Sequence, residues 1–92
     1  MKAQIVFARV GDGRRGAYLK AWTEWTGTLF TMGIRTQLFE SAGRPGEFTE
    51  ITWFAEGQEA ALADDRLVRV NDALGAAAEE RTGALKLHAL VA

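Results

Sequence analysis

The feature that most constrains this chain is a mismatch between its strands and its helices. Four segments have the β-branched and aromatic character of strands, and apolar side chains occupy both odd and even positions in them. Successive strand residues point to opposite faces, so both faces of the resulting sheet carry apolar groups. Only two regions are helical in character, enough to cover one face. The sequence therefore predicts that a second copy of the chain covers the other face.

The strand-like runs span residues 4–10, 34–40, 48–54 and 84–91. Helical spacing of Tyr18, Trp22, Trp25 and Leu29 predicts a helix between the first two runs. Pro45-Gly46 suits the central positions of a type II turn, which predicts an antiparallel hairpin between the second and third runs.

The alanine-rich segment 58–82 is predicted to form a short helix, a break at Asp64 or Asp65, and a longer helix that Gly83 ends. The order is βαββαβ. It predicts an α+β, ferredoxin-like fold: a four-stranded antiparallel sheet, strands one and three central, with both helices on one face.

Strand alternation divides the side chains into two sets, and a bulge in any strand would exchange the sets of that strand. Arg9, Arg35 and Glu50 are expected on the uncovered face, where they would fix how two sheets align. The set expected beneath the helices is Val6, Ala8, Val10, Leu38, Ile51, Trp53, Leu87, Ala89 and Val91. The set expected on the uncovered face is Ile5, Phe7, Arg9, Arg35, Gln37, Phe39, Phe48, Glu50, Thr52, Phe54, Lys86, His88 and Leu90.

Length and charge restrict the partners. The 92 residues predict a single domain spanning 1–92, whose modest core a second subunit would extend. The net charge is -1 and the basic residues are scattered, so no nucleic acid or anionic membrane partner is predicted. No apolar run is long enough to span a bilayer. The absence of cysteine excludes disulfides and fits a cytoplasmic location.

Candidate functional residues are few. His88 is the only histidine, and with Glu50 it is a candidate catalytic pair for proton transfer; the alternative is a hydrogen bond at an interface. Tyr18, Trp22, Trp25 and Trp53 are candidates to line a pocket for an aromatic ligand, or else to fill the core. No metal site and no cofactor are predicted, because one histidine without cysteine is a poor ligand set.

The segment 11–16, GDGRRG, matches the glycine pattern of dinucleotide-binding proteins. That fold needs a parallel second strand, whereas the second strand here enters a hairpin. We therefore interpret the segment as a flexible entry to the first helix, with Arg14 and Arg15 open to a phosphate-like anion.

The whole chain resembles the dimeric α/β-barrel superfamily, in particular its antibiotic-biosynthesis-monooxygenase-like and NIPSNAP-like domains. The similar stretches are YLKAWTEW at 18–25 and FTEITWFAEGQEAAL at 48–62. The resemblance implies a homodimer closed through the sheet faces, and a ligand cleft between helices and sheet. It also implies a cofactor-independent monooxygenase-like or isomerase-like enzyme acting on a small aromatic molecule. The alternative is a non-catalytic module that binds a small apolar ligand or a structural partner.

Overall fold

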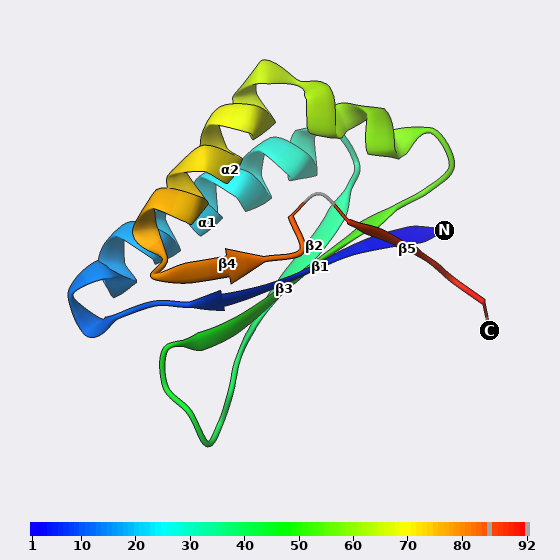
Figure 1. The fold of residues 1–92 in the computed structure, drawn as a ribbon. Coiled ribbons are helices and arrows are strands. Elements are labelled where there is room, and N and C mark those ends of the chain that lie inside the picture. Colours follow the sequence, from blue (N-terminus) through cyan, green and yellow to red (C-terminus); the bar gives the residue numbers. More distant parts are fainter. Residues whose placement is uncertain (85, 92) are drawn as a thin grey trace.

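The computed structural model describes residues 1–84 and 86–91, and Figure 1 shows two helices lying over one face of an antiparallel sheet. The longer strands are β1 (Lys2–Arg9), β2 (Arg35–Glu40) and β3 (Glu47–Phe54), and the shorter are β4 (Glu80–Thr82) and β5 (Leu87–Ala89). The helices are α1 (Arg15–Thr31) and α2 (Asp65–Ala77), each preceded by a 3₁₀ segment, Asp12–Arg14 and Gln58–Ala63 respectively.

The strand order is β2-β3-β1-β4, with β5 also paired to β1. Every pairing is antiparallel, and β1 and β3 are central. This confirms the predicted α+β, ferredoxin-like architecture. No helix among the described residues is long and apolar enough to cross a membrane.

The hairpin between β2 and β3 forms at the predicted turn. The Glu47 amide donates to the Arg44 carbonyl at 3.1 Å, with Pro45 and Gly46 between them. Gly46 has φ +89°, the left-handed value that a type II turn requires at its third position. A Cβ atom at Gly46 would also lie 2.6 Å from the Val10 carbonyl oxygen, so glycine is needed there twice over.

The region 58–77 also forms as predicted, in two pieces. Asp64 has extended backbone, and its carboxylate accepts from the Arg66 amide at 2.9 Å, capping α2. The spacing of Leu67, Val70 and Leu74 then turns one apolar stripe of α2 toward the core.

The end of α2 differs from the prediction. The helix stops at Ala77 rather than continuing to Thr82, because residues 80–82 pair with β1 as β4. Helix propensity of the alanine-rich segment is a weak preference, and an unpaired sheet edge outweighs it. Gly83 therefore ends a strand and not a helix, with φ +95° against the backbone of Ile5.

The predicted last strand, 84–91, is likewise wrong in its bounds. Two short strands share the edge of β1: Thr82 of β4 pairs with Phe7, and Leu87 of β5 pairs with Gln4. Residues 83, 84 and 86 belong to neither strand, and residue 85 lies outside the described residues.

The face assignment was right for β1 and for Leu38 but wrong for β3. Val6 pairs with Glu50, Ala8 with Phe48 and Gln4 with Thr52, so the even-numbered residues of both strands lie beneath the helices. Ile51 and Trp53, expected there, point the other way. Seven residues, an odd number, lie between the paired Glu40 and Phe48, and this spacing sets the register.

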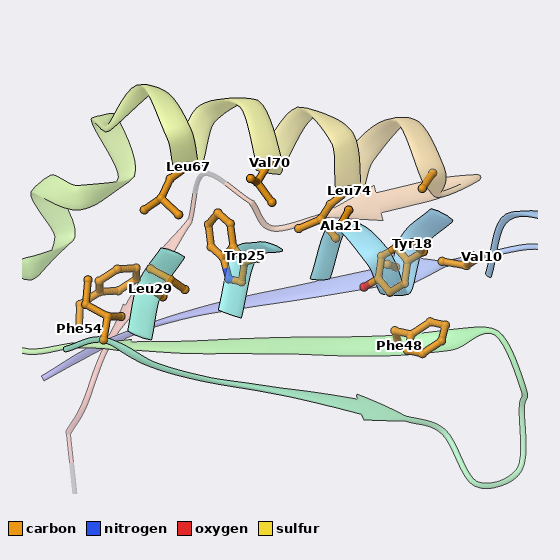
Figure 2. Packing of buried hydrophobic residues seen from close by; sticks show 13 residues of the cluster. Val10, Tyr18, Ala21, Trp25, Leu29, Phe48, Phe54, Leu67, Val70 and Leu74 are labelled. Atoms are coloured by element: carbon orange, nitrogen blue, oxygen red, sulfur yellow. The ribbon is translucent and has the colours of Figure 1, made fainter. Parts of the chain in front are cut away.

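Figure 2 shows the resulting core between the helices and the sheet. Tyr18, Trp25 and Leu29 of α1 meet Phe48 and Phe54 of β3 and the apolar stripe of α2. Tyr18 and Phe54 are fully buried, and Trp25 is 1% exposed. Burying side chains of this size contributes about 1.5–3 kcal/mol each, so this layer supplies most of the stability that the chain has by itself.

Candidate functional site

The sheet face opposite the helices, which we call the open face, is organised in four rows of paired residues. At one end Arg35, Trp53, Ala3 and His88 lie side by side, followed by Gln37, Ile51 and Ile5. The third row is Phe39, Thr49, Phe7 and Thr82, and the fourth is Glu47, Arg9 and Glu80. Apolar side chains predominate in the middle of this face, Arg35 lies at one end, and the row of Glu47, Arg9 and Glu80 forms the other end.

The third and fourth rows enclose a depression of about 490 Å³, which we call the open-face hollow. Phe7 and Phe39 stand in it 58% and 52% exposed, with Thr49 between them. Depressions of this size commonly hold small molecules, and apolar walls with a few polar groups are typical of such sites. The hollow is therefore the best candidate site on the molecule.

Ion pairs surround the hollow. The Arg9 guanidinium lies 3.4 Å from the Glu79 carboxylate and 3.5 Å from that of Glu80. Glu47 pairs with Arg44 at 3.6 Å. These carboxylates are well exposed, so their ion pairs contribute little to the stability of the fold.

Glu40, beside the hollow, is more tightly held. Its carboxylate accepts two hydrogen bonds from the Arg15 guanidinium, one of them at 2.8 Å, and one from the Gly46 amide at 2.9 Å. These bonds lower the pKa of Glu40 to about 2, with the Arg15 bond as the largest cause. The same guanidinium lies over the Phe48 ring at 5.4 Å, so Arg15 ties α1 to the hairpin.

A second polar group lies under the helices. Glu50 is 2% exposed and accepts from Tyr18 at 2.6 Å and from Arg81 at 2.8 and 3.0 Å. Arg81 also donates to the Asn71 side chain at 2.8 Å. Elements α1, α2, β3 and β4 thus meet at one buried ion pair, in which both oxygens of Glu50 are engaged.

Burial raises the pKa of the Tyr18 hydroxyl, and the negative charge of Glu50 raises it further. Tyr18 therefore stays protonated and donates to Glu50. Trp25 also has its polar atom occupied, since its indole nitrogen donates to the Thr52 hydroxyl at 3.4 Å. The polar atoms of Tyr18, Trp25 and Glu50 are therefore all hydrogen bonded within the chain.

The structure separates the aromatic residues that were expected to line one pocket. Tyr18 and Trp25 are core residues, and Trp22 packs partly buried against them. Trp53 lies on the open face instead, where the Arg35 guanidinium stacks on its ring at 4.9 Å. The four side chains therefore do not surround one cavity.

The structure also separates His88 from Glu50. His88 pairs with Ala3, on the open face, whereas Glu50 pairs with Val6 on the helix face. No proton can pass directly between side chains on opposite faces of a sheet. A catalytic role for either residue remains a prediction, but not as a pair.

Sequence reasoning missed Arg81, because it was expected inside a helix, and the row formed by Phe39, Thr49 and Phe7. The signal for that row was present: a loop of odd length pairs residues of equal parity across a hairpin. Among residues 1–84 and 86–91, no three His, Asp or Glu side chains gather as a metal site.

No family model matches the sequence, and no curated protein is significantly similar to it. Solved structures are similar in fold. One is a protein from Nitrosomonas europaea assigned provisionally as an antibiotic biosynthesis monooxygenase, with 18% identity, complete coverage of both chains and a TM-score of 0.80. Another antibiotic biosynthesis monooxygenase aligns over 100% of this chain and 98% of its own, at 15% identity and a TM-score of 0.78.

The chain has the fold of the antibiotic-biosynthesis-monooxygenase-like proteins. A protein of unknown function from Bacteroides thetaiotaomicron, described as a possible oxidoreductase, is also similar. Its identity is 26% over 95% of this chain and 92% of its own, with a TM-score of 0.73. The resemblance inferred from the sequence is thus confirmed at the level of the fold.

Proposed function

We propose that this chain, as a single domain spanning 1–92, is a homodimer whose two open faces pack together and bind a small aromatic molecule between them. The observation that carries this proposal is the open-face hollow. Its exposed Phe7 and Phe39 share one row and adjoin Ile5 and Ile51, and a contiguous apolar patch commonly marks an interaction site. The helix face, in contrast, has its aromatic residues packed and hydrogen bonded.

The apolar centre of the open face also supports the proposed dimer. Ile5 and Ile51 are paired there and half-buried in the single chain, and Trp53 lies one row away. A second sheet packed against this strip would cover them and leave the hollow, at the hairpin end, as an internal space. The family resemblance supports the same arrangement.

Sedimentation velocity at micromolar concentration tests the dimer. We expect a dimer for the natural chain and a folded monomer for Phe39→Asp, because a buried charge without a partner opposes packing. Phe30→Asp is the matched control: Phe30 is 82% exposed, but it lies on α1 and should leave the dimer intact. A natural chain that sediments as a monomer would contradict the proposal.

A second candidate is a cofactor-independent monooxygenase-like or isomerase-like enzyme at the same place. The carboxylates of Glu47 and Glu80 line the hollow and supply a base for proton removal there, whereas His88 lies at the other end of the same face. For Glu50 we propose a positioning role, since Arg81 and Tyr18 occupy it. The cysteine-free sequence supports a reducing, cytoplasmic location.

Tryptophan fluorescence separates these proposals. Aromatic phenols and quinones are added to the natural chain and to Trp53→Phe, which keeps the buried Trp25 as the reference emitter. We expect saturable quenching that is weaker in the variant, because Trp53 is on the open face. Oxygen uptake or product formation with a ligand that binds would indicate the enzyme. Binding without either would indicate a non-catalytic binding module. No saturable binding by any aromatic compound would contradict both.

A further inference from the structure

The third row of the open face alternates large and small side chains across neighbouring strands. Phe39 on β2 and Phe7 on β1 flank Thr49 on β3, so a small residue separates two phenyl groups. Neighbouring strands are about 4.8 Å apart, which places the two phenylalanine positions roughly 10 Å apart. All three residues line the open-face hollow. The sheet therefore holds a slot between two aromatic side chains.

The width of the slot matches one aromatic ring. A ring inserted midway would have its centre about 5 Å from each phenyl group, within the roughly 4.5–7 Å at which aromatic pairs interact favourably. Thr49, a small side chain, forms the floor of this space. A larger residue at position 49 would fill this space.

The adjacent row supplies charge. Arg9 is shared by two carboxylates, Glu79 and Glu80, so one guanidinium faces two negative groups. Glu47, on the other side of Arg9, has the single partner Arg44, and Glu40 is matched by Arg15. The ion pairs around the hollow therefore leave one carboxylate in excess. This row lies two residues along the strands, about 7 Å from the slot.

Resting on the proposed function, we infer that the ligand of the open-face hollow is a single aromatic ring that carries a protonated amine on a short linker. The ring lies between Phe7 and Phe39, and the ammonium group lies toward Glu80 and Glu47. An aromatic acid of the same size is rejected, because its carboxylate would face these two side chains, while Arg9 is already occupied.

Three probes of nearly equal size test this inference by NMR titration of the full chain: 2-phenylethylamine, 2-phenylethanol and phenylacetate. We expect affinity to fall in that order, with the amine binding at least about tenfold more tightly than the acid at low salt. This difference in affinity should become smaller as salt screens the charges. Phenylacetate binding as tightly as the amine would overturn the inference.

Variants locate the site. Thr49→Leu fills the slot and should weaken the amine at least about tenfold, whereas Thr49→Ser, which keeps the hydroxyl and leaves the slot open, should bind it within about threefold of the natural chain. Glu80→Gln should weaken the binding of the amine only, so that the affinities of the amine and of phenylacetate become more similar. It needs no change in the slot, so it remains informative if Thr49→Leu disturbs assembly.

The two levels of the proposal fail differently. If the fluorescence screen finds aromatic ligands but the amine does not bind, or binds equally to Thr49→Leu, the inference is overturned and the proposed function stands. If no aromatic compound of any charge binds, the proposed function falls with it.

Discussion

The two faces of this sheet carry similar types of residue in opposite environments, buried on one face and exposed on the other. Phe48 and Phe54 on the helix face are 3% exposed and fully buried, while Phe7 and Phe39 on the open face are more than half exposed. Polar groups differ as well: Glu50 under the helices is fully hydrogen bonded, whereas Glu80 on the open face shares one arginine with Glu79. One face holds the fold together, and the other leaves large apolar side chains exposed in the single chain.

The buried ion pair shows what the helix face is built to do. Taking Glu50 and Arg81 out of water is costly, and good geometry on both oxygens offsets that cost. Arg81 comes from β4, a strand of only three residues. Our hypothesis is that the pair fixes where this short strand joins β1, a matter of specificity more than of stability.

One of the two largest expected effects follows from removing one partner of this pair. Arg81→Met leaves the Glu50 carboxylate buried with Tyr18 as its remaining donor, and we expect a loss of about 3–5 kcal/mol in the free energy of unfolding. Denaturant unfolding followed by circular dichroism measures it.

A double variant is the control. Glu50→Met with Arg81→Met removes both charges, so it should recover most of the stability lost in the single variant. If the double variant is less stable than Arg81→Met, the cost comes from packing and not from the uncompensated charge, and the contrast between the two faces weakens.

A matched pair of phenylalanines tests the two faces directly. Phe54→Ala should lower the free energy of unfolding by about 3–5 kcal/mol, because it opens a cavity in the core. Phe39→Ala should change the unfolding of dilute, monomeric protein by less than about 1 kcal/mol, yet weaken the dimer. Unfolding at two protein concentrations separates these effects. Equal losses from both variants would show that the open face also stabilises the single chain.

The difference between the faces was only partly visible in the sequence. Local patterns predicted the helices, the hairpin and a cap at Asp64 or Asp65, which the structure has at Asp64, because each depends on residues close together in the chain. Periodicity also showed that both faces of the sheet are apolar. It could not say which residues of β3 share a face with Val6, since that depends on strand register.

The candidate site suffered most from this limit. Because the two faces of β3 were exchanged in the prediction, Glu50 was expected beside His88, and Trp53 beside Trp25. In the structure the two members of each pair lie on opposite faces of the sheet. Arg81 was hidden for another reason: an alanine-rich stretch favours a helix locally, and only the edge of β1 draws residues 80–82 into a strand. Register and edge pairing are tertiary properties.

A smaller effect is expected from the second donor to Glu50. Tyr18→Phe removes the 2.6 Å hydrogen bond but keeps the ring that packs 4.8 Å from Phe48. Hydrogen bonds to charged groups contribute about 1.5–3 kcal/mol, and we expect a loss in that range. The Glu50→Gln/Tyr18→Phe double variant measures the coupling between the two residues. Additive losses would mean that the bond contributes nothing beyond packing.

The smallest effect concerns the hairpin beside the hollow and depends on pH. The pKa of Glu40 is lowered from 4.5 to about 2. Its charged form therefore stabilises the fold at pH values above its pKa in the unfolded chain, and that contribution is lost as pH falls from about 4.5 through 2. Glu40→Gln should therefore flatten the dependence of stability on pH within this window. Glu56→Gln, an exposed glutamate after β3, is the matched control for charge. Thermal unfolding between pH 2 and 6 measures the slopes. A slope in Glu40→Gln equal to that of the natural chain would mean that the bonds from Arg15 and Gly46 do not form in solution, and that the hairpin edge of the hollow is as loosely held as its outer carboxylates.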